Sequence, residues 1–290
     1  MQTFNNLPQP FRDESFDILR WGISDNPSID VYINQPKDFA FLYPAPSVDY
    51  SNYVPRVQKF GLTDYKKGLH VIERRFDKIE HHLQKGHHTL LEIGAGDGAF
   101  LKTVRKNLPD IHLTAMDKDQ NSLPSRVKNS DENYDSLEAV IRNDWRFDVI
   151  CLFHVMEHIQ APLEFLEMVK EIMAPHSTLI IEVPSLFDPL ISIYNCDAYS
   201  EFYFSRQHPY VFSPPSLERL MESGGFQSDE LINFQRYGLE NHLGWLNHGK
   251  PGGNALFRQL FSELESGYTV ALEKKGKTDT VIWIGRKAVK

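Results

Sequence analysis

The chain has 290 residues, with 31 Lys and Arg against 39 Asp and Glu, which makes its formal net charge −8. Hydrophobic residues form 41 % of the sequence and charged residues 24 %, a globular balance that excludes an intrinsically disordered chain. The acidic balance argues against a nucleic-acid partner, because no basic surface is available to displace counterions from phosphates.

The cysteine count and the hydropathy of the chain exclude further classes of protein. Cys151 and Cys196 are too few for a disulfide framework or a zinc-finger ligand set. The first residues lack the basic and apolar regions of a signal peptide, and no apolar run approaches the ~20 residues that span a bilayer. We therefore expect a soluble, cytoplasmic protein with no membrane partner.

Residues 1–63 differ in composition from the rest of the chain. Proline fixes φ and lacks a donor, so the prolines spread through this segment argue against long helices. Aromatic rings lie between them, and so many rings would not be left in water. We predict an irregular cap or lid packed on the main domain; a partly ordered extension is the alternative.

Strands and helices alternate from residue 64 onward, beginning with a helix whose apolar residues recur at three- and four-residue steps. Apolar runs predict strands at 89–93, 113–116, 147–153 and 178–183, and a helix opens at Ala161-Pro162. The tail adds helices near 215–223 and 254–274 and strands near 229–237 and 280–285. This alternation predicts a doubly wound, mostly parallel α/β domain over 64–290, with insertions at 186–212 and 238–254.

A glycine-rich turn follows the first of these strands. Gly94, Gly96 and Gly98 permit positive φ and a close approach of a ligand to the backbone, and the first amides of the next helix are free to bind it. A tight turn without a ligand is the alternative. The strand-turn-helix context favours a cofactor loop.

Two cofactor classes fit this loop. Its Gly-x-Gly-x-x-Ala pattern, with Asp117 about 20 residues later, matches the dinucleotide fingerprint. However, Glu92 and Asp97 place negative charge around the loop, which opposes a pyrophosphate. S-adenosylmethionine carries an ammonium and a sulfonium and no phosphate, so the carboxylates favour it.

Glu92-x-Gly94-x-Gly96-x-Gly98 resembles the first motif of class I S-adenosylmethionine-dependent methyltransferases. Further resemblances follow in the family's order: 147–159 is similar to its fourth strand and the loop beside the donor methyl, and 174–183 to its fifth strand. The stretch 208–226 is similar to a subgroup that includes sugar and quinone-precursor enzymes.

This resemblance implies a Rossmann-like methyltransferase fold, S-adenosylmethionine as cofactor, and a set of cofactor-binding residues. Asp117 would hold the ribose hydroxyls, and Asp135 would lie near the adenine amino group. Asp135 is equally consistent with a helix cap, since Glu138 completes a capping box. The expected cofactor-binding residues are Glu92, Gly94, Ala95, Gly96, Gly98, Asp117, Asp135, Phe153 and His154.

The sequence His154-x-x-Glu157-His158 also matches an inverted zinc-peptidase motif. That motif needs both histidines on one continuous helix, whereas here His154 is expected at a strand end. We therefore predict no metal site and a structural role for His158.

Two polar and aromatic stretches, 187–212 and 236–242, are candidates for the acceptor site. The first follows the fifth strand, where ligands bind in open α/β folds. Packing under a long insertion, or a surface loop, is the alternative. The predicted substrate-binding residues are Tyr194, Tyr199, Arg206, His208, Tyr210, Asn241 and His242.

These features predict a methyltransferase acting on a small-molecule acceptor, preferably a hydroxyl of a sugar or glycan precursor in carbohydrate biosynthesis. A hydroxyl must lose its proton, and His208, with His154 second, is the predicted base. An N- or C-methyltransferase of a small metabolite, a non-catalytic nucleotide-binding partner or sensor, and an NAD-dependent oxidoreductase remain alternatives. A homodimer is left open.

Overall fold

The computed structural model of the chain describes residues 4, 6–47, 65–83 and 86–289, without the side chains of 65–69 and 258. The chain divides into two compact units. The first unit comprises Met1–Ser47, Met156–Leu163 and Glu182–Trp283; the second comprises Val48–Val155, Glu164–Ile181 and Ile284–Lys290. The expected boundary at residues 63 and 64 lies outside the described residues.

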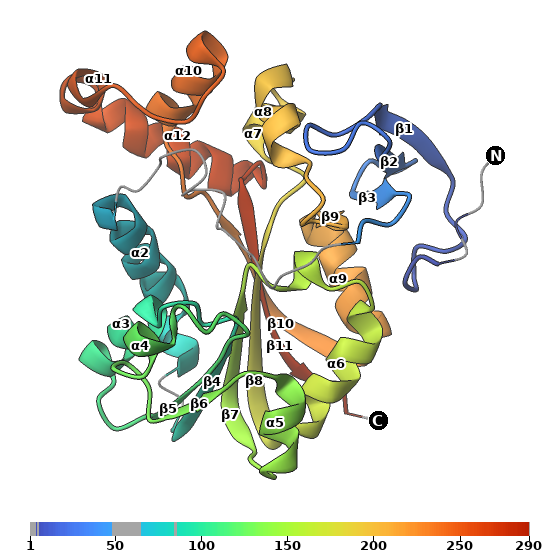
Figure 1. Ribbon diagram of the computed structural model, residues 1–290. Coiled ribbons are helices and arrows are strands. Elements are labelled where there is room, and N and C mark those ends of the chain that lie inside the picture. Colours follow the sequence, from blue (N-terminus) through green and yellow to red (C-terminus); the bar gives the residue numbers. More distant parts are fainter. Residues whose placement is uncertain (1–3, 5, 48–64, 84–85, 290) are drawn as a thin grey trace. The chain divides into compact units, whose positions relative to one another are not determined.

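A seven-stranded sheet has the order β10-β11-β8-β7-β4-β5-β6 (Figure 1). Strand β4 pairs in parallel with both β5 and β7, and β5 pairs in parallel with β6. This confirms the doubly wound, mostly parallel α/β fold. The strands are β4 (Thr89–Ile93), β5 (His112–Met116), β6 (Glu132–Tyr134), β7 (Phe147–Phe153), β8 (Met173–Pro184), β10 (Phe226–Phe234) and β11 (Thr280–Lys287).

Helices cover both faces of the strands in the second unit, with α2 and α3 on one face and α5 and α6 on the other (Figure 1). The apolar residues that the sequence spaced three or four apart are buried on these helices, as Phe76 and Ile79 on α2 and Val104 on α3 show. The helices are α2 (Tyr65–Leu83), α3 (Ala99–Asn107), α4 (Leu123–Arg126), α5 (Leu137–Arg142) and α6 (Pro162–Glu171).

The amino-terminal segment is not irregular where it is described: β1 (Phe16–Arg20), β2 (Asp30–Asn34) and β3 (Phe39–Tyr43) form an antiparallel sheet. Strand β9 (Tyr210–Phe212) extends this sheet beside β3. The prolines of the described segment lie outside the strands, where their missing donors leave the ladder intact. The rings do pack, as predicted: Phe4 has ring contacts with Phe16, Tyr32, Phe41 and Tyr43.

The remaining elements of the first unit depart from the sequence expectations in detail. The helix expected over 254–274 is two helices that meet at Phe261, and the stretch 238–254, expected as an insertion, contains a helix. The core of this unit joins residues 23–42, 186–211 and Trp245. The elements are η1 (Met156–His158, a 3-10 turn), α7 (Pro189–Ser192), α8 (Asp197–Tyr203), α9 (Pro214–Ser223), α10 (Leu239–His248), α11 (Ala255–Leu260) and α12 (Ser262–Lys275).

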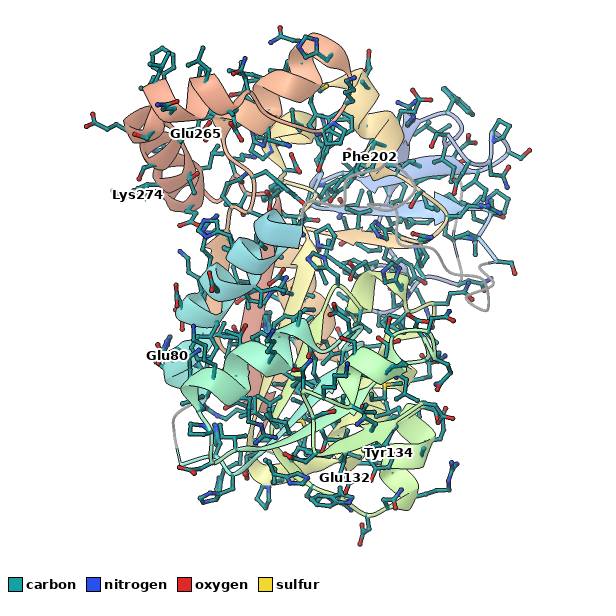
Figure 2. The ribbon with its side chains drawn as sticks, turned by 60° about the vertical axis from the view of Figure 1, so that its left-hand side comes forward. Glu80, Glu132, Tyr134, Phe202, Glu265 and Lys274 are labelled. Carbon is teal, nitrogen blue, oxygen red and sulfur yellow. The ribbon has the colours of Figure 1, made fainter. Side chains whose placement is uncertain are left out.

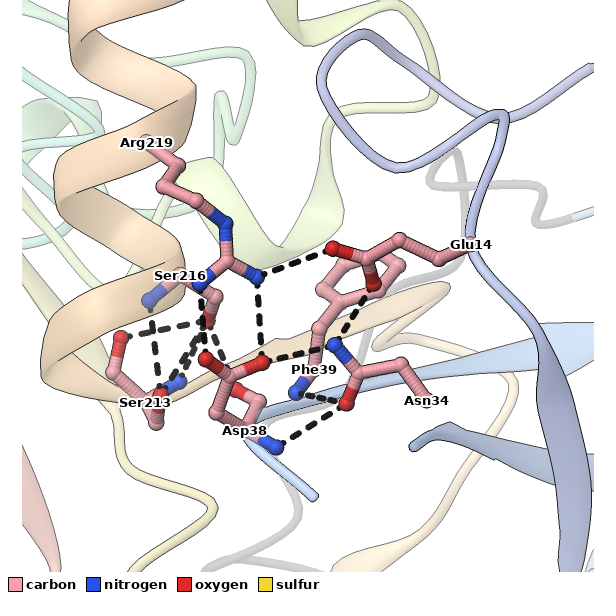
Figure 3. Close-up of polar contacts among 7 residues, drawn as sticks. All are labelled: Glu14, Asn34, Asp38, Phe39, Ser213, Ser216 and Arg219. Carbon is pink, nitrogen blue, oxygen red and sulfur yellow. Dashed lines mark hydrogen bonds and ion pairs between the residues drawn. The ribbon is translucent and has the colours of Figure 1, made fainter. Parts of the chain in front are cut away.

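A polar cluster holds the amino-terminal strands against α9 (Figure 3). Arg219 donates from both terminal nitrogens to the Asp38 carboxylate, at 2.7 and 3.0 Å, and pairs with Glu14 at 3.3 Å. Burial alone would raise the pKa of Asp38, but the hydrogen bonds from Arg219 and Asn34 lower it below its usual value. This carboxylate therefore stabilises the folded unit in its charged form.

None of the helices in the described part of the chain combines the length and apolar character that a membrane crossing requires.

Candidate functional site and family

The glycine turn between β4 and α3 adopts a backbone that side chains rarely permit. Gly94, Gly96 and Gly98 have φ of 77°, 53° and 79°. A Cβ on Gly94 would lie 2.4 Å from Cγ2 of Val155, whereas a Cβ on Gly96 would meet nothing within 4 Å. Gly94 is thus required for packing, and the open side of the turn is at Gly96.

The Asp117 carboxylate closes this turn. Its Oδ2 accepts a 2.7 Å hydrogen bond from the Gly96 amide, and its Oδ1 accepts one of 2.7 Å from the Asp119 amide. The amides of Gly94 and Ala95 both donate to the Met116 carbonyl. Each carboxylate oxygen can accept more than one bond, so Asp117 positions the turn and retains acceptor capacity, and its role toward the ribose hydroxyls stays a prediction.

Arg126 is a residue of this site that the sequence did not reveal. It is fully buried on α4, and its Nη1 donates to the Gly96 carbonyl at 2.8 Å. Its Nη2 donates to the Asp117 carbonyl at 3.3 Å. No motif marked it, because an arginine within a short helix looks like a surface residue until tertiary structure buries it.

Glu92 is 4 % exposed, and one of its oxygens, Oε2, has no hydrogen-bond partner within the described part of the chain. Burial raises the pKa of Glu92 well above its usual value, a shift that Arg75 opposes and that Asp117 and Asp97 reinforce. An ammonium group beside this carboxylate would offset the desolvation and satisfy the oxygen. The residues present therefore fit the cationic amino acid part of S-adenosylmethionine.

The end of β7 carries two further predicted residues. The Phe153 ring is nearly buried, with the Arg75 guanidinium 4.6 Å from its centroid and Phe100 packed edge-on at 4.6 Å. His154 has a φ of 58°, uncommon for a residue other than glycine, and such strain often accompanies a functional site. Because Val155 contacts Gly94, this bend lies directly against the glycine turn.

A pocket of about 300 Å³ opens near the end of β6 and is lined by Gln120, Leu123, Arg126, Asn133, Tyr134 and Asp135. Figure 2 labels Tyr134 beside Glu132 on this strand. Asp135 does not cap the next helix, whose N-cap is Ser136 without a side-chain cap bond. The observed position agrees with a ligand contact for Asp135, and its adenine role stays a prediction.

Comparison with known protein families identifies the family of this chain. Residues 63–231, more than half of the chain, match the family model described as a methyltransferase domain. The chain belongs to this methyltransferase family. It is an enzyme of the S-adenosylmethionine-dependent class, with S-adenosylmethionine as its cofactor.

Solved structures share the fold at low sequence identity. A methyltransferase from Archaeoglobus fulgidus, described as SAM dependent, is 18 % identical, with a TM-score of 0.53 over 80 % of this chain and 98 % of its own. The plantazolicin methyltransferase BpumL in complex with SAH is 17 % identical (TM-score 0.51; 82 % and 92 % covered). A SAM-dependent methyltransferase from Thermotoga maritima is 16 % identical (TM-score 0.50; 80 % and 97 % covered). No curated protein sequence matches the chain significantly.

In the first unit of the methyltransferase, the predicted acceptor residues Tyr194 and His242 both contact Tyr268, which was not predicted. The Tyr268 hydroxyl lies 2.7 Å from His242 Nδ1 and 3.0 Å from the Tyr194 hydroxyl. Burial lowers the pKa of His242 to about 4, an effect that Asp279 opposes, so its imidazole is neutral near pH 7. Tyr268 lies on α12, which the sequence marked only as a generic helix.

Tyr199 and Tyr210 are mainly packing residues. The Tyr199 hydroxyl donates to Asp188 at 2.6 Å and the ring is buried in the core of the first unit. Burial, reinforced by Asp279, raises the pKa of Asp188 to about 7. The Tyr210 hydroxyl donates to the Gln160 carbonyl at 3.0 Å. Both hydroxyls are thus engaged inside the protein.

Arg206, a predicted acceptor residue, lies at the surface, and its acceptor role stays a prediction. Its side chain is 48 % exposed and forms an ion pair with Asp25 at 3.3 Å. The partner, Asp25, is remote in sequence, so the local sequence could not predict this ion pair. Asn241 is half-buried on α10, and its acceptor role stays a prediction.

His208 lies in a cluster with Glu157 and His158. The two imidazole rings are 4.9 Å apart between centroids, and Glu157 is 2 % exposed. The region 154–158 is not a continuous helix, because His154 has a left-handed backbone and η1 is a three-residue turn. This rejects the inverted zinc-peptidase arrangement for His154 and His158, as expected.

Proposed function

We propose that this methyltransferase acts on a hydroxyl oxygen of a small acceptor, a sugar or glycan precursor, in carbohydrate biosynthesis. The observation that carries the proposal is the half-buried His158–His208 imidazole pair. His158 Nδ1 donates to the Gln207 carbonyl at 2.6 Å, and an imidazole is the side-chain group that most often removes a proton from a reacting group in enzymes.

An oxygen acceptor makes a specific demand on the chain. S-adenosylmethionine supplies an activated methyl group, so the protein needs mainly to orient the acceptor, a contribution of roughly 7–11 kcal/mol in favourable cases. A neutral hydroxyl must also lose its proton as the bond to carbon forms. His208 is our first candidate for this base and His154 the second.

The Tyr194–Tyr268–His242 group supports a hydroxyl-rich acceptor. It combines polar edges with ring faces, since Tyr194 packs edge-on to His242 with centroids 6.1 Å apart. Sugars present the complementary surface, with hydroxyl edges and apolar faces. The resemblance of 208–226 to sugar and quinone-precursor enzymes points the same way.

The test is turnover of the purified full chain with S-adenosylmethionine and matched acceptor panels bearing hydroxyl, amine or activated carbon groups. We expect S-adenosylhomocysteine to form with sugar-type hydroxyl acceptors, and mass spectrometry to locate the methyl on oxygen. Methylation of amine or carbon acceptors alone would select the alternative transferase. Donor binding without turnover on any panel would favour a sensor or partner protein.

The cytoplasmic location and the homodimer belong to the proposal as well. Both rest on sequence reasoning, and light scattering of the purified chain decides between monomer and dimer.

A further inference from the structure

Three potential metal ligands converge in the first unit of the methyltransferase. Glu157, His158 and His208 each offer one ligand atom, and these atoms lie within 4.8 Å of one another. Two imidazoles and one carboxylate form a donor set that holds borderline divalent transition metals in many enzymes. Ligand atoms around a tetrahedral ion at about 2.1 Å would lie about 3.4 Å apart, so only small side-chain movements are needed.

The second observation is the orientation of His158. Its Nδ1 lies 2.6 Å from the Gln207 carbonyl, an acceptor only, so Nδ1 carries a hydrogen, and in the neutral imidazole the lone pair is on Nε2. A metal-binding histidine nearly always donates its other ring nitrogen to such a carbonyl or carboxylate, which sets the tautomer and the ring direction. The bond therefore prepares Nε2 for a ligand.

The backbone around the cluster is also held from both sides. The His158 bond reaches the residue before His208, and the Tyr210 hydroxyl donates back to the Gln160 carbonyl at 3.0 Å. The His208 amide donates to the Ser205 carbonyl at 2.9 Å. These bonds hold η1 and the segment before β9 together, so the three side chains converge without further folding.

We propose that Glu157, His158 and His208 bind a divalent transition-metal ion such as Zn²⁺ or Fe²⁺. Three protein ligands leave at least one coordination position for water or for an oxygen of another molecule, as in catalytic rather than structural sites. The buried Glu157 carboxylate gains a compensating positive charge from the ion. The set differs from the zinc-peptidase motif, because His208 from a remote segment replaces His154.

The role of the ion, unlike the site itself, rests on the proposed function. A hydroxyl that coordinates the ion becomes more acidic and loses its proton to solvent; the oxygen then forms the bond to the methyl carbon while the carbon–sulfur bond breaks. The products are the methyl ether and S-adenosylhomocysteine. In this arrangement His208 is a ligand and the ion replaces it as the activator of the hydroxyl.

The test uses the chelator-treated full chain titrated with Co²⁺, followed by visible absorption, with Zn²⁺ as competitor. We expect one equivalent to bind with the absorption of nitrogen and oxygen ligation. Azide should change the spectrum by entering the open position. His208→Ala and Glu157→Gln should each weaken binding by roughly 100-fold or more, since even outer partners of metal ligands contribute 10- to 100-fold.

His176→Ala is the matched control, because His176 is an exposed histidine outside the cluster, and it should bind the ion as the unchanged protein does. Titration of S-adenosylhomocysteine shows that each variant is folded. Absence of binding in the unchanged protein, or equal affinity in the cluster variants, overturns the proposal. Metal binding without hydroxyl methylation would refute the proposed function alone, and hydroxyl methylation by the metal-free protein would refute the role of the ion alone.

Discussion

The cofactor turn of the second unit and the imidazole cluster of the first are built in opposite ways. Every predicted cofactor residue lies between Glu92 and His154, at or near the ends of β4, β5, β6 and β7. The cluster instead takes Glu157 and His158 from one segment and His208 from another. Parallel strands bring their carboxyl ends to one edge by topology, so short motifs reveal the first site. Only tertiary contacts assemble the second.

The largest effect is expected at the glycine turn, where a substitution should prevent binding of the cofactor. Gly96→Val should abolish binding of S-adenosylhomocysteine in calorimetry, because a branched side chain at φ of 53° projects where the turn is open. Gly86→Val is the matched control: Gly86 also has positive φ, 73°, and open space around its Cβ. Both changes should cost about 1–2 kcal/mol of stability, and normal binding in Gly96→Val would displace the cofactor site.

Removing an imidazole from the other site should lower turnover without weakening the binding of the cofactor. His208→Ala should lower kcat by roughly 100- to 10,000-fold, the range for loss of acid–base catalysis, and leave the affinity for S-adenosylhomocysteine unchanged. Exposed His176 serves again as the control position. Unchanged turnover in His208→Ala would remove this residue from the reaction.

The buried His242 makes the stability of the first unit depend on pH. Its folded pKa of about 4 lies below the unfolded value of about 6.5, so between these pH values the unfolded chain binds more protons. Stability should therefore fall as pH drops through this window, by about 3 kcal/mol from this group. Denaturant titrations of the protein and of His242→Gln should differ in this slope, and parallel curves would contradict the assignment.

The smallest expected effect is a difference in stability between two variants of the first unit, one that loses a partly buried ion pair and one that loses an exposed ion pair. Arg219→Met removes two charged hydrogen bonds from Asp38 and should cost about 2–3 kcal/mol of unfolding free energy. Arg206→Met breaks the exposed pair with Asp25 and should cost less than about 1 kcal/mol. Equal losses in urea titrations would show that the Arg219 cluster does not stabilise the amino-terminal strands.

The sequence predicted the strands and helices correctly where apolar residues recur with the period of the element. The strands of the parallel sheet are nearly continuous apolar runs, since both faces are covered, and α2 and α3 show their buried faces at helical spacing. It failed for residues 16–43, where the prolines masked three short strands. Those strands depend on pairing with one another and with β9, more than 160 residues along the chain from β3.

For the sites, the glycines, Asp117 and Glu92 could be predicted as cofactor residues because their chemistry and spacing are local, and their binding roles stay predictions. Arg126, Tyr268 and Asp188 were missed, since nothing near them in the chain predicts burial or partners. The ion pair of Arg206 with Asp25 was missed for the same reason.

The amino-acid sequence by itself determined the α/β class, the cofactor turn and the methyltransferase assignment, because local periodicity and backbone requirements are written in consecutive residues. Only the tertiary structure decided the amino-terminal sheet, the buried Arg126 behind the turn, and the meeting of His208 with Glu157 and His158. Contacts between remote segments form when burial and pairing offset the entropy of closing long loops, and that balance is not visible in any short stretch of sequence.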